Sequence, residues 1–275
     1  MKLKAQLTPL LLTVATAFGL CVVLYLFLTF LNLFPIKQHI QLALRPVDIL
    51  VGMTIYLKTS IDFAILIGNL MRTNPGWKKR IAIEIGTALG NALGTLLVLT
   101  IWFFFKEVPI LMVIMIFIAA LVLLKMAEEG FAEFLHQPRF REITKLVTLI
   151  NKSLYKFNRV FAPFISKVLP QMGITKTQSL PFCQLLILSF TVPFIFGLDD
   201  FAGYIPLFNI INVFSFCVGV FLAHMALNIA LFASPKKTTA IVNHPAIILI
   251  GSCAFVGIAV WGMFEAVEII IHMFL

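Results

Sequence analysis

Long runs of apolar residues occupy most of the chain and are separated by short polar segments. The runs are continuous rather than alternating, so they favour helices over the strands of a membrane barrel. A helix needs about 20 residues to cross the hydrocarbon of a bilayer, and these runs reach that length. The pattern predicts an all-α integral membrane protein with about seven transmembrane helices. The predicted spans are 7–34, 47–71, 81–105, 110–135, 180–208, 210–232 and 245–275.

The composition supports this class and argues against an ordinary soluble domain. Hydrophobic residues make up 61% of the 275 residues and charged residues 12%, whereas soluble domains carry about 25% charged residues. We expect no nucleic-acid partner despite the net charge of +9, because basic residues in membrane proteins more often mark cytoplasmic loops. The four cysteines lie in apolar runs without a CxxC pair, which is typical of small hydrophobic side chains.

Lysine and arginine are distributed unevenly between the two sides of this topology. The N-terminus and the segments 72–80, 136–179 and 233–244 hold sixteen of them, and the opposite side holds three. The positive-inside rule therefore predicts a cytoplasmic N-terminus and an external C-terminus in a bacterial-type cytoplasmic (inner) membrane. The first apolar run is too long for a signal peptide, which indicates an uncleaved helix.

The segment 136–179 is the one sizeable polar part of the chain. Between residues 142 and 169, apolar residues recur at helical spacing with basic residues between them. This pattern predicts an amphipathic helix on the anionic inner leaflet, with membrane lipid as its partner. A regulatory or partner-binding role is the alternative.

The second half of the chain repeats features of the first. Asp62-Phe-Ala returns as Asp200-Phe-Ala after 138 residues, and Met-Ala-Glu128 returns as Met-Phe-Glu265 after 137 residues. A unit of three spans is odd, so its second copy is inverted in the membrane, as in many secondary transporters. The predicted parts are an additional N-terminal helix with an outer loop (1–46), repeat 1 (47–135), the basic linker (136–179) and repeat 2 (180–275).

Ionisable residues inside the spans are the first candidates for a functional site, because a charge at the bilayer centre costs about 2.5–3.5 kcal/mol. Asp62 follows Lys58 by one helical turn, which permits either a structural ion pair or a gating counter-charge. Asp199 and Asp200 stand among two prolines and two glycines. This predicts an interrupted helix whose carbonyls join the carboxylates as oxygen ligands. The alternative is a span that ends early and exposes both acids to water.

Other polar residues have plainer explanations beside the functional ones. Glu265 and Glu268 share a helix face, and Glu128 lies at the place in repeat 1 that corresponds to Glu265. His224 and Asn228 also share a face, where interhelical hydrogen bonding competes with a role in proton coupling.

Two features of the third span indicate structure rather than transport. Glu84 stands near the start of this span, where an acid is favourable at a helix N-terminus without any transport role. Gly86, Gly90 and Gly94 form a GxxxGxxxG face that predicts close helix packing.

The run Ser60-Ile-Asp-Phe-Ala-Ile-Leu-Ile-Gly68 is similar to the aspartate motif of MntP-type manganese exporters. Together with Asp199-Asp200 and the three-plus-three layout, it resembles the lysine-exporter (LysE) superfamily, including CadD- and TerC-type metal-resistance proteins. The resemblance covers residues 47–275 in layout. It implies that Asp62 and Asp200 bind the exported divalent cation. Lys58, the first span and the lack of a Glu-Gly-Asp signature depart from the pattern of these families.

These observations predict a secondary transporter that exports a divalent metal cation, with Mn²⁺ as the first choice, in exchange for H⁺ or Na⁺. Oxygen ligands suit Mn²⁺, Mg²⁺ and Ca²⁺. An exporter of amino acids or small organic solutes and a non-transporting membrane assembly subunit are the alternatives. No catalytic or nucleotide-binding motif is present, so we expect neither an enzyme nor a cofactor. A homo-oligomer is compatible with the sequence. The predicted metal residues are Asp62, Asp199, Asp200, Glu128 and Glu265, and the predicted gating or proton-coupling residues are Lys58, His224, Asn228 and Glu268.

Overall fold

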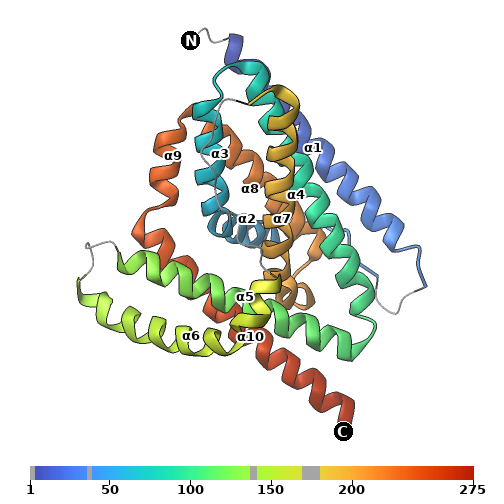
Figure 1. The fold of residues 1–275 in the computed structure, drawn as a ribbon. Helices are drawn as coiled ribbons and strands as arrows, with labels where there is room; N and C mark the ends of the chain where they lie inside the picture. Colours follow the sequence, from blue (N-terminus) through green and yellow to red (C-terminus); the bar gives the residue numbers. More distant parts are fainter. Residues whose placement is uncertain (1–3, 36–38, 137–140, 169–179) are drawn as a thin grey trace. The chain divides into compact units, whose positions relative to one another are not determined.

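The computed structural model describes residues 4–35, 39–136, 141–168 and 180–275, and these residues form helices and no strand (Figure 1). Each predicted span corresponds to a helix or, for 47–71, to a pair of helices. The elements are α1 (Lys4–Leu31), α2 (Pro46–Thr59), α3 (Ile61–Thr73), α4 (Trp77–Phe105), α5 (Pro109–Leu135), α6 (Arg141–Val168), α7 (Phe182–Tyr204), the 3₁₀ turn η1 (Ile205–Asn209), α8 (Val213–Ala233), α9 (Pro235–Val242) and α10 (Pro245–Phe274).

Five helices of the described part are long and apolar enough to cross a membrane, namely α1, α4, α5, α8 and α10. The pair α2 and α3 gives a sixth candidate, which is bent by 65°. The apolar part of α7, Phe182–Phe194, is shorter than a span. The protein is therefore a helical, multi-pass membrane protein with five or six candidate spans in the described residues. The number of seven and the inverted repeat stay predictions.

The interruption predicted around Asp199 and Asp200 is not present in the backbone. Helix α7 continues through Pro193 to Tyr204, and η1 follows it directly. A proline removes one backbone hydrogen bond, and a membrane helix can continue where neighbouring groups compensate for that loss. In the described part of the chain, the broken helix lies instead between α2 and α3.

The chain divides into two compact units. Unit 1 comprises Met1–Ile101, Ile174–Phe201 and Ile210–Val242, and unit 2 comprises Trp102–Gly173, Ala202–Asn209 and Asn243–Leu275. The boundaries of the predicted repeats stay predictions, as do those of the additional helix and the linker.

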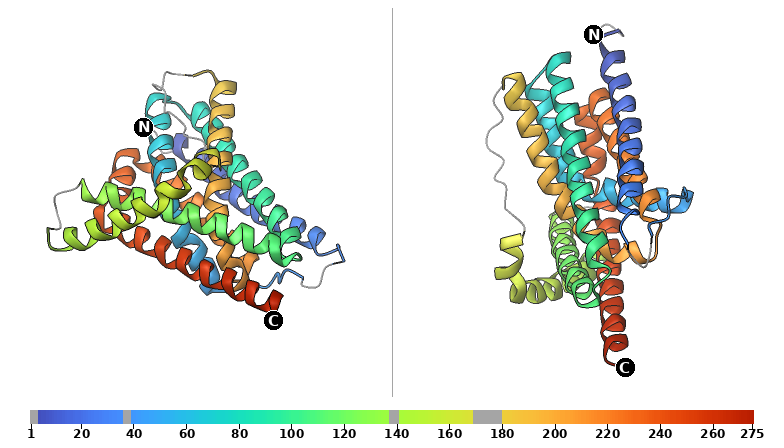
Figure 2. Two further views of the ribbon diagram at one scale, coloured as in Figure 1. Left: turned by 60° about the horizontal axis from the view of Figure 1, so that its bottom comes forward. Right: turned by 90° about the vertical axis from the view of Figure 1, so that its right-hand side faces the viewer.

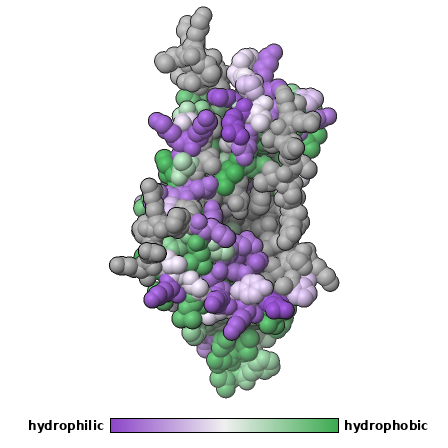
Figure 3. Space-filling view, turned by 60° about the vertical axis from the view of Figure 1, so that its left-hand side comes forward, coloured by the Kyte–Doolittle hydropathy of each residue, from purple (hydrophilic) through white to green (hydrophobic). Residues whose placement is uncertain are grey.

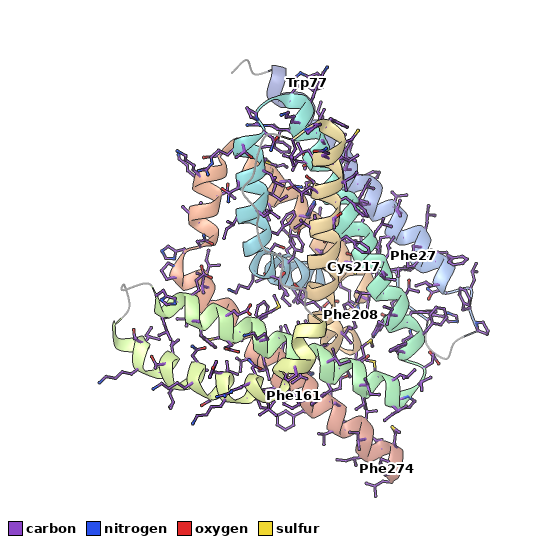
Figure 4. All side chains as sticks on the ribbon, viewed as in Figure 1. Phe27, Trp77, Phe161, Phe208, Cys217 and Phe274 are labelled. Atoms are coloured by element: carbon purple, nitrogen blue, oxygen red, sulfur yellow. The ribbon has the colours of Figure 1, made fainter. Side chains whose placement is uncertain are left out.

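Helix α8 lies at the centre of unit 1 and packs against α1, α2, α3 and α9 (Figure 1). Its Cys217 is fully buried in the interior of the unit (Figure 4). Helices α2 and α8 approach each other closely at two glycines. A Cβ atom on Gly52 would lie 3.0 Å from the carbonyl carbon of Phe216, and one on Gly219 would lie 3.0 Å from that of Ile49. Small residues let membrane helices bring their backbones together in this way.

The first turns of α2 and α8 are joined by hydrogen bonds. The side chain of Asn212 caps α8 by accepting from the Ser215 amide at 2.8 Å. The Asn212 amide donates to Asp48 Oδ2 at 3.0 Å, and the Arg45 amide donates to Ser215 Oγ at 2.8 Å. Proline at the start of α2 suits the first helical turn, which leaves amides without partners in any case. These bonds fix where α2 begins against α8.

In unit 2, α5 packs along α10, and η1 and α6 also contact α5 (Figure 2). Gly262 of α10 gives room to Pro206, whose side chain would lie 2.8 Å from an added Cβ atom. The rings of Phe117 on α5 and Phe161 on α6 have centroids 6.0 Å apart. Helix α6 confirms the predicted helix at 142–169, whereas its position on a membrane surface stays a prediction.

Apolar side chains are exposed on the membrane helices, as expected where lipid is the solvent. The last turns of α10 form the hydrophobic end of the molecular face in Figure 3, and Phe274 is 82% exposed there.

Candidate functional site

The break between α2 and α3 lies at Ser60, which is 2% exposed. Its backbone has φ −84° and ψ 19°, outside the regular helix. The Ser60 amide donates to the Tyr56 carbonyl at 2.9 Å, and the Ser60 carbonyl accepts from the Ala64 amide at 2.8 Å. The Thr59 hydroxyl also donates to the Tyr56 carbonyl at 3.1 Å. These bonds hold the bend in place inside the apolar part of the chain.

The imidazole of His224 on α8 contacts both sides of this break. His224 Nδ1 lies 2.7 Å from the hydroxyl of Tyr56, in the last turn of α2. The imidazole centroid is 5.6 Å from the ring of Phe63, in the first turn of α3. Tyr56 and His224 are each 3% exposed. The break therefore has a buried, ionisable side chain from another helix packed directly against it.

Asn228 continues this hydrogen-bonded chain one turn further along α8. The assigned orientation of its amide directs Nδ2 at His224 Nε2, at 3.0 Å. That ring nitrogen is then the acceptor, so Nδ1 carries the hydrogen and donates it to the Tyr56 oxygen. His224 is thus a neutral imidazole with both nitrogens bonded. The pair His224 and Asn228 makes the interhelical hydrogen bonds that were one of the two predictions for it, and its role in coupling stays a prediction.

Glu84 is the buried acid of this cluster. It is the eighth residue of α4 and only 1% exposed. The side chains of Thr13 and Thr16 on α1 and of Asn228 on α8 lie next to its carboxyl group. The interpretation of Glu84 as a helix-terminus acid without further role is wrong about its surroundings, because α1 and α8 enclose the carboxyl group.

The Glu84 carboxyl group lacks full compensation within the described part of the chain. Glu84 Oε2 is buried there without a hydrogen-bond partner. No described lysine, arginine or histidine forms an ion pair with it within 4.0 Å. A buried charge without a partner is unfavourable, so the carboxyl group is expected to be neutralised by a proton or by another positive ion.

The glycine face of α4 packs as predicted. A Cβ atom on Gly86 would lie 2.8 Å from Cβ of Ser189 on α7, and one on Gly90 would lie 3.1 Å from the Phe194 amide nitrogen. These close approaches confirm a packing function for the two glycines. They also hold α4 so that its polar face points to the other side.

The predicted acids of unit 2 have partners from the protein. Glu128 is 8% exposed, and its Oε2 accepts from Asn158 Nδ2 of α6 at 2.7 Å and from Lys125 Nζ at 3.2 Å. Glu265 is half-buried and hydrogen-bonded to Asn209 of η1. These arrangements describe structural contacts. They leave the predicted roles of Glu128 and Glu265 in metal binding as predictions.

The remaining predicted residues are placed as follows. Lys58 is half-buried in the last turn of α2, directly before the break. Glu268 is exposed and lies 3.9 Å from Nε2 of His272. The side chains of Asp62, Asp199 and Asp200 lie outside the described residues, although their backbones belong to α3 and α7. No three described His, Cys, Asp or Glu side chains come together as a group that could hold a metal ion.

A signal for the buried face of α4 is present in the sequence. Glu84, Thr87, Asn91 and Thr95 recur at intervals of three and four residues in an otherwise apolar helix, and all are 2% exposed or less. Polar residues on one face of a membrane helix indicate a face turned toward protein.

Comparisons with protein-family models, with curated proteins and with solved structures find no match.

Proposed function

We propose that the protein is a secondary transporter that exports a divalent metal cation, with Mn²⁺ as the first choice, in exchange for H⁺ or Na⁺. The observation that carries this proposal is the break at Ser60 with the buried His224 against it. Secondary transporters bind substrates and coupling ions where membrane helices are discontinuous and polar groups line the interruption.

The predicted ligand Asp62 stands two residues after the break, in the first turn of α3. Any backbone carbonyl that such an interruption frees would be a hard oxygen ligand like a carboxylate. Asp62 and Asp200 are the proposed metal ligands, and Asp199 is proposed to assist them. The roles in metal binding predicted for Glu128 and Glu265 of unit 2 stay predictions. Lys58 is proposed as a counter-charge that the metal must displace.

The test is metal transport by the purified full-length protein in proteoliposomes that contain a Mn²⁺-sensitive dye. We expect Asp62→Asn and Asp200→Asn each to abolish Mn²⁺ flux, because each removes one negative charge from the metal site. Glu129→Gln is the matched control, since Glu129 has a side chain 65% exposed and lies in another helix. Full flux in both aspartate variants would refute this mechanism, and no flux in the wild type would favour a non-transporting assembly subunit.

Lys58 supports a second candidate function. A lysine and an aspartate on either side of the break could bind the carboxylate and the amino group of a zwitterion. Charge-assisted hydrogen bonds of this kind would suit an exporter of amino acids or small organic solutes. Uptake of a labelled amino acid by the same liposomes would favour this candidate if Mn²⁺ flux is absent or is inhibited by that amino acid.

The proposed arrangement in the membrane places the N-terminus in the cytoplasm and the C-terminus outside, in a bacterial-type inner membrane. Helix α6 is proposed to lie on the inner leaflet. Leu149 and Val160 are 65% and 73% exposed on this helix, and Lys152 and Lys156 are exposed beside them. Exposed apolar side chains next to lysines suit an anionic lipid surface.

A further inference from the structure

We propose that Glu84, Asn228 and the hydroxyl groups of Thr13 and Thr16 form a binding site for one monovalent cation, either H⁺ or Na⁺. The site is distinct from the proposed metal ligands. Its role as the coupling site rests on the proposed function, whereas the binding of a cation does not.

The charge of the site argues for a single positive charge. Glu84 is 1% exposed, and no described cationic side chain lies within 4.0 Å of its carboxyl group. A lone carboxylate in an apolar interior is unfavourable until a positive ion neutralises it. One carboxylate balances one proton or one Na⁺ and leaves a divalent ion half-compensated.

The available atoms argue for a cation as well. Glu84 Oε2 and Asn228 Oδ1 are both buried acceptor oxygens that have no partner in the described part of the chain. The Thr16 hydroxyl donates its hydrogen toward the carbonyls of Leu12 and Thr13, each at 2.9 Å, so its oxygen can still accept. Hard cations take oxygen ligands, and Na⁺ is a hard cation that carboxylate, amide and hydroxyl oxygens can bind. If Glu84 is protonated instead, its carboxyl O–H can donate a hydrogen bond to one of these neighbouring oxygens.

The site assigns a function to the additional helix α1. Thr13 and Thr16 are three residues apart and therefore lie on the same helix face. Thr13 is 1% exposed, although most of the membrane-crossing part of α1 is not covered by protein. The one deeply buried polar position of the described α1 thus lies at the Glu84 carboxyl group.

Few other titratable groups lie on the elements that enclose Glu84. On α8 the nearest is His224, which is held neutral between Tyr56 of α2 and Asn228. On α4 it is Arg80, one turn earlier, whose Nη1 lies 3.5 Å from the carbonyl of Phe232. The described side chains of α1 add Cys21 and Tyr25, which lie more than one turn beyond Thr16.

The site is connected to the broken helix by direct hydrogen bonds. Asn228 is a neighbour of Glu84 and bonds to His224, which bonds to Tyr56 at the end of α2. Loss of the cation from Glu84 changes what Asn228 can accept or donate, and this change reaches the break through two contacts. The arrangement is therefore suited to couple ion occupancy to the conformation of α2 and α3.

The test measures cation binding on the purified full-length protein in detergent without any transported metal. Thermal unfolding is followed in one series from pH 5 to pH 9 in choline chloride, and in a second series with NaCl replacing choline chloride at constant ionic strength. A proton site predicts a wild-type Tm that falls as pH rises, because deprotonation leaves a buried charge. A sodium site predicts a Tm that rises with Na⁺, since a ligand that binds the folded state stabilises it.

Glu84→Gln is expected to remove whichever dependence the wild type shows, while Glu129→Gln retains it. Thr13→Val and Thr16→Val are expected to raise the half-saturating Na⁺ concentration several-fold, or to shift the pH midpoint, without unfolding the protein. Thr29→Val is their matched control, because the Thr29 hydroxyl is exposed and donates to the Tyr25 carbonyl of its own helix. Glu84→Asp keeps the carboxyl group on a shorter side chain, so it is expected to raise the half-saturating Na⁺ concentration or to shift the pH midpoint, and it covers the case in which Glu84→Gln does not fold.

Equal pH and Na⁺ dependence in the wild type, Glu84→Gln or Glu84→Asp, and both threonine variants would overturn the site. Absence of Mn²⁺ flux together with a Glu84-dependent Tm would refute the proposed function and retain the cation site. Mn²⁺ flux together with a pH and Na⁺ dependence of Tm that does not change in the Glu84 variants would retain the proposed function and refute the cation site.

Discussion

Replacing Gly219 with alanine tests the helix contact that holds His224 against the broken span. Gly219 lies on α8, five residues before His224, and faces the backbone of Ile49 on α2. Gly52 makes the reciprocal contact from α2 to Phe216. A methyl group at position 219 must push α2 and α8 apart, because the obstacle is main chain and not a flexible side chain.

The magnitude follows from the crowding at this contact. The added Cβ atom would overlap the carbonyl oxygen of Ile49 and would lie 3.0 Å from its carbonyl carbon and 3.1 Å from its Cα, whereas ordinary contact begins at 3.4 Å. Overpacking of this kind costs about 1–3 kcal/mol. Alanine recovers about 0.5–1 kcal/mol relative to glycine within a helix. Because the obstacle is main chain, we take the upper end of this cost, about 3 kcal/mol, so the net loss is about 2–2.5 kcal/mol and lowers Tm by roughly 4–10 °C.

The assay is thermal unfolding of the purified variant in detergent, followed by tryptophan fluorescence or circular dichroism. Gly19→Ala is the matched control, since a Cβ atom on Gly19 of α1 meets nothing within 4 Å. It keeps the gain in helix propensity and lacks the clash, so its Tm should equal or exceed that of the wild type. A Tm for Gly219→Ala that matches that of Gly19→Ala would show that α2 and α8 are not in close backbone contact.

Three further predictions concern other parts of the structure. Tyr56→Phe should destabilise the protein by about 1–3 kcal/mol, because a buried nitrogen of His224 loses its partner. Tyr155→Phe, at a side chain 55% exposed, should not change the unfolding midpoint. Asn158→Ala should increase hydrogen exchange in α6, because it removes the bond of 2.7 Å that joins this helix to a buried carboxylate of α5, and unchanged exchange would contradict this role. Alkaline phosphatase fused to the C-terminus should be active, because it would lie outside the cytoplasm. An inactive phosphatase fusion, together with fluorescence from a reporter at the C-terminus that fluoresces only in the cytoplasm, would reverse the predicted orientation.

The sequence predicts the position of a helix where the residues of that segment alone determine it. The helices α1, α4, α5, α8 and α10 occupy the predicted apolar runs, because a chain segment in lipid must satisfy its backbone hydrogen bonds within itself. Helix α6 was accessible for a similar reason, since its apolar residues recur with the helical period over the whole segment. The glycines at 86 and 90 were identified correctly as packing positions, because close helix contact requires small side chains.

The location of the broken helix could not be predicted from the residues of that segment alone. Prolines and glycines predicted a break around Asp199, yet α7 is continuous there, and the break lies at Ser60. A single proline changes one hydrogen bond of a helix, which surrounding structure can compensate. The bend at Ser60 is accompanied by contacts with His224, which is 164 residues away in the chain.

Glu84 shows most clearly what the sequence determined and what only the tertiary structure decided. The sequence determined that a carboxyl group and three further polar residues share one face of a membrane helix. It did not determine what covers that face, and an acid near a helix start is equally compatible with exposure to water. The structure places Thr13 and Thr16 of α1 and Asn228 of α8 around the carboxyl group. Enclosure by distant helices removes the water that would otherwise solvate the charge, and this converts an ordinary helix-start acid into a site that requires a cation.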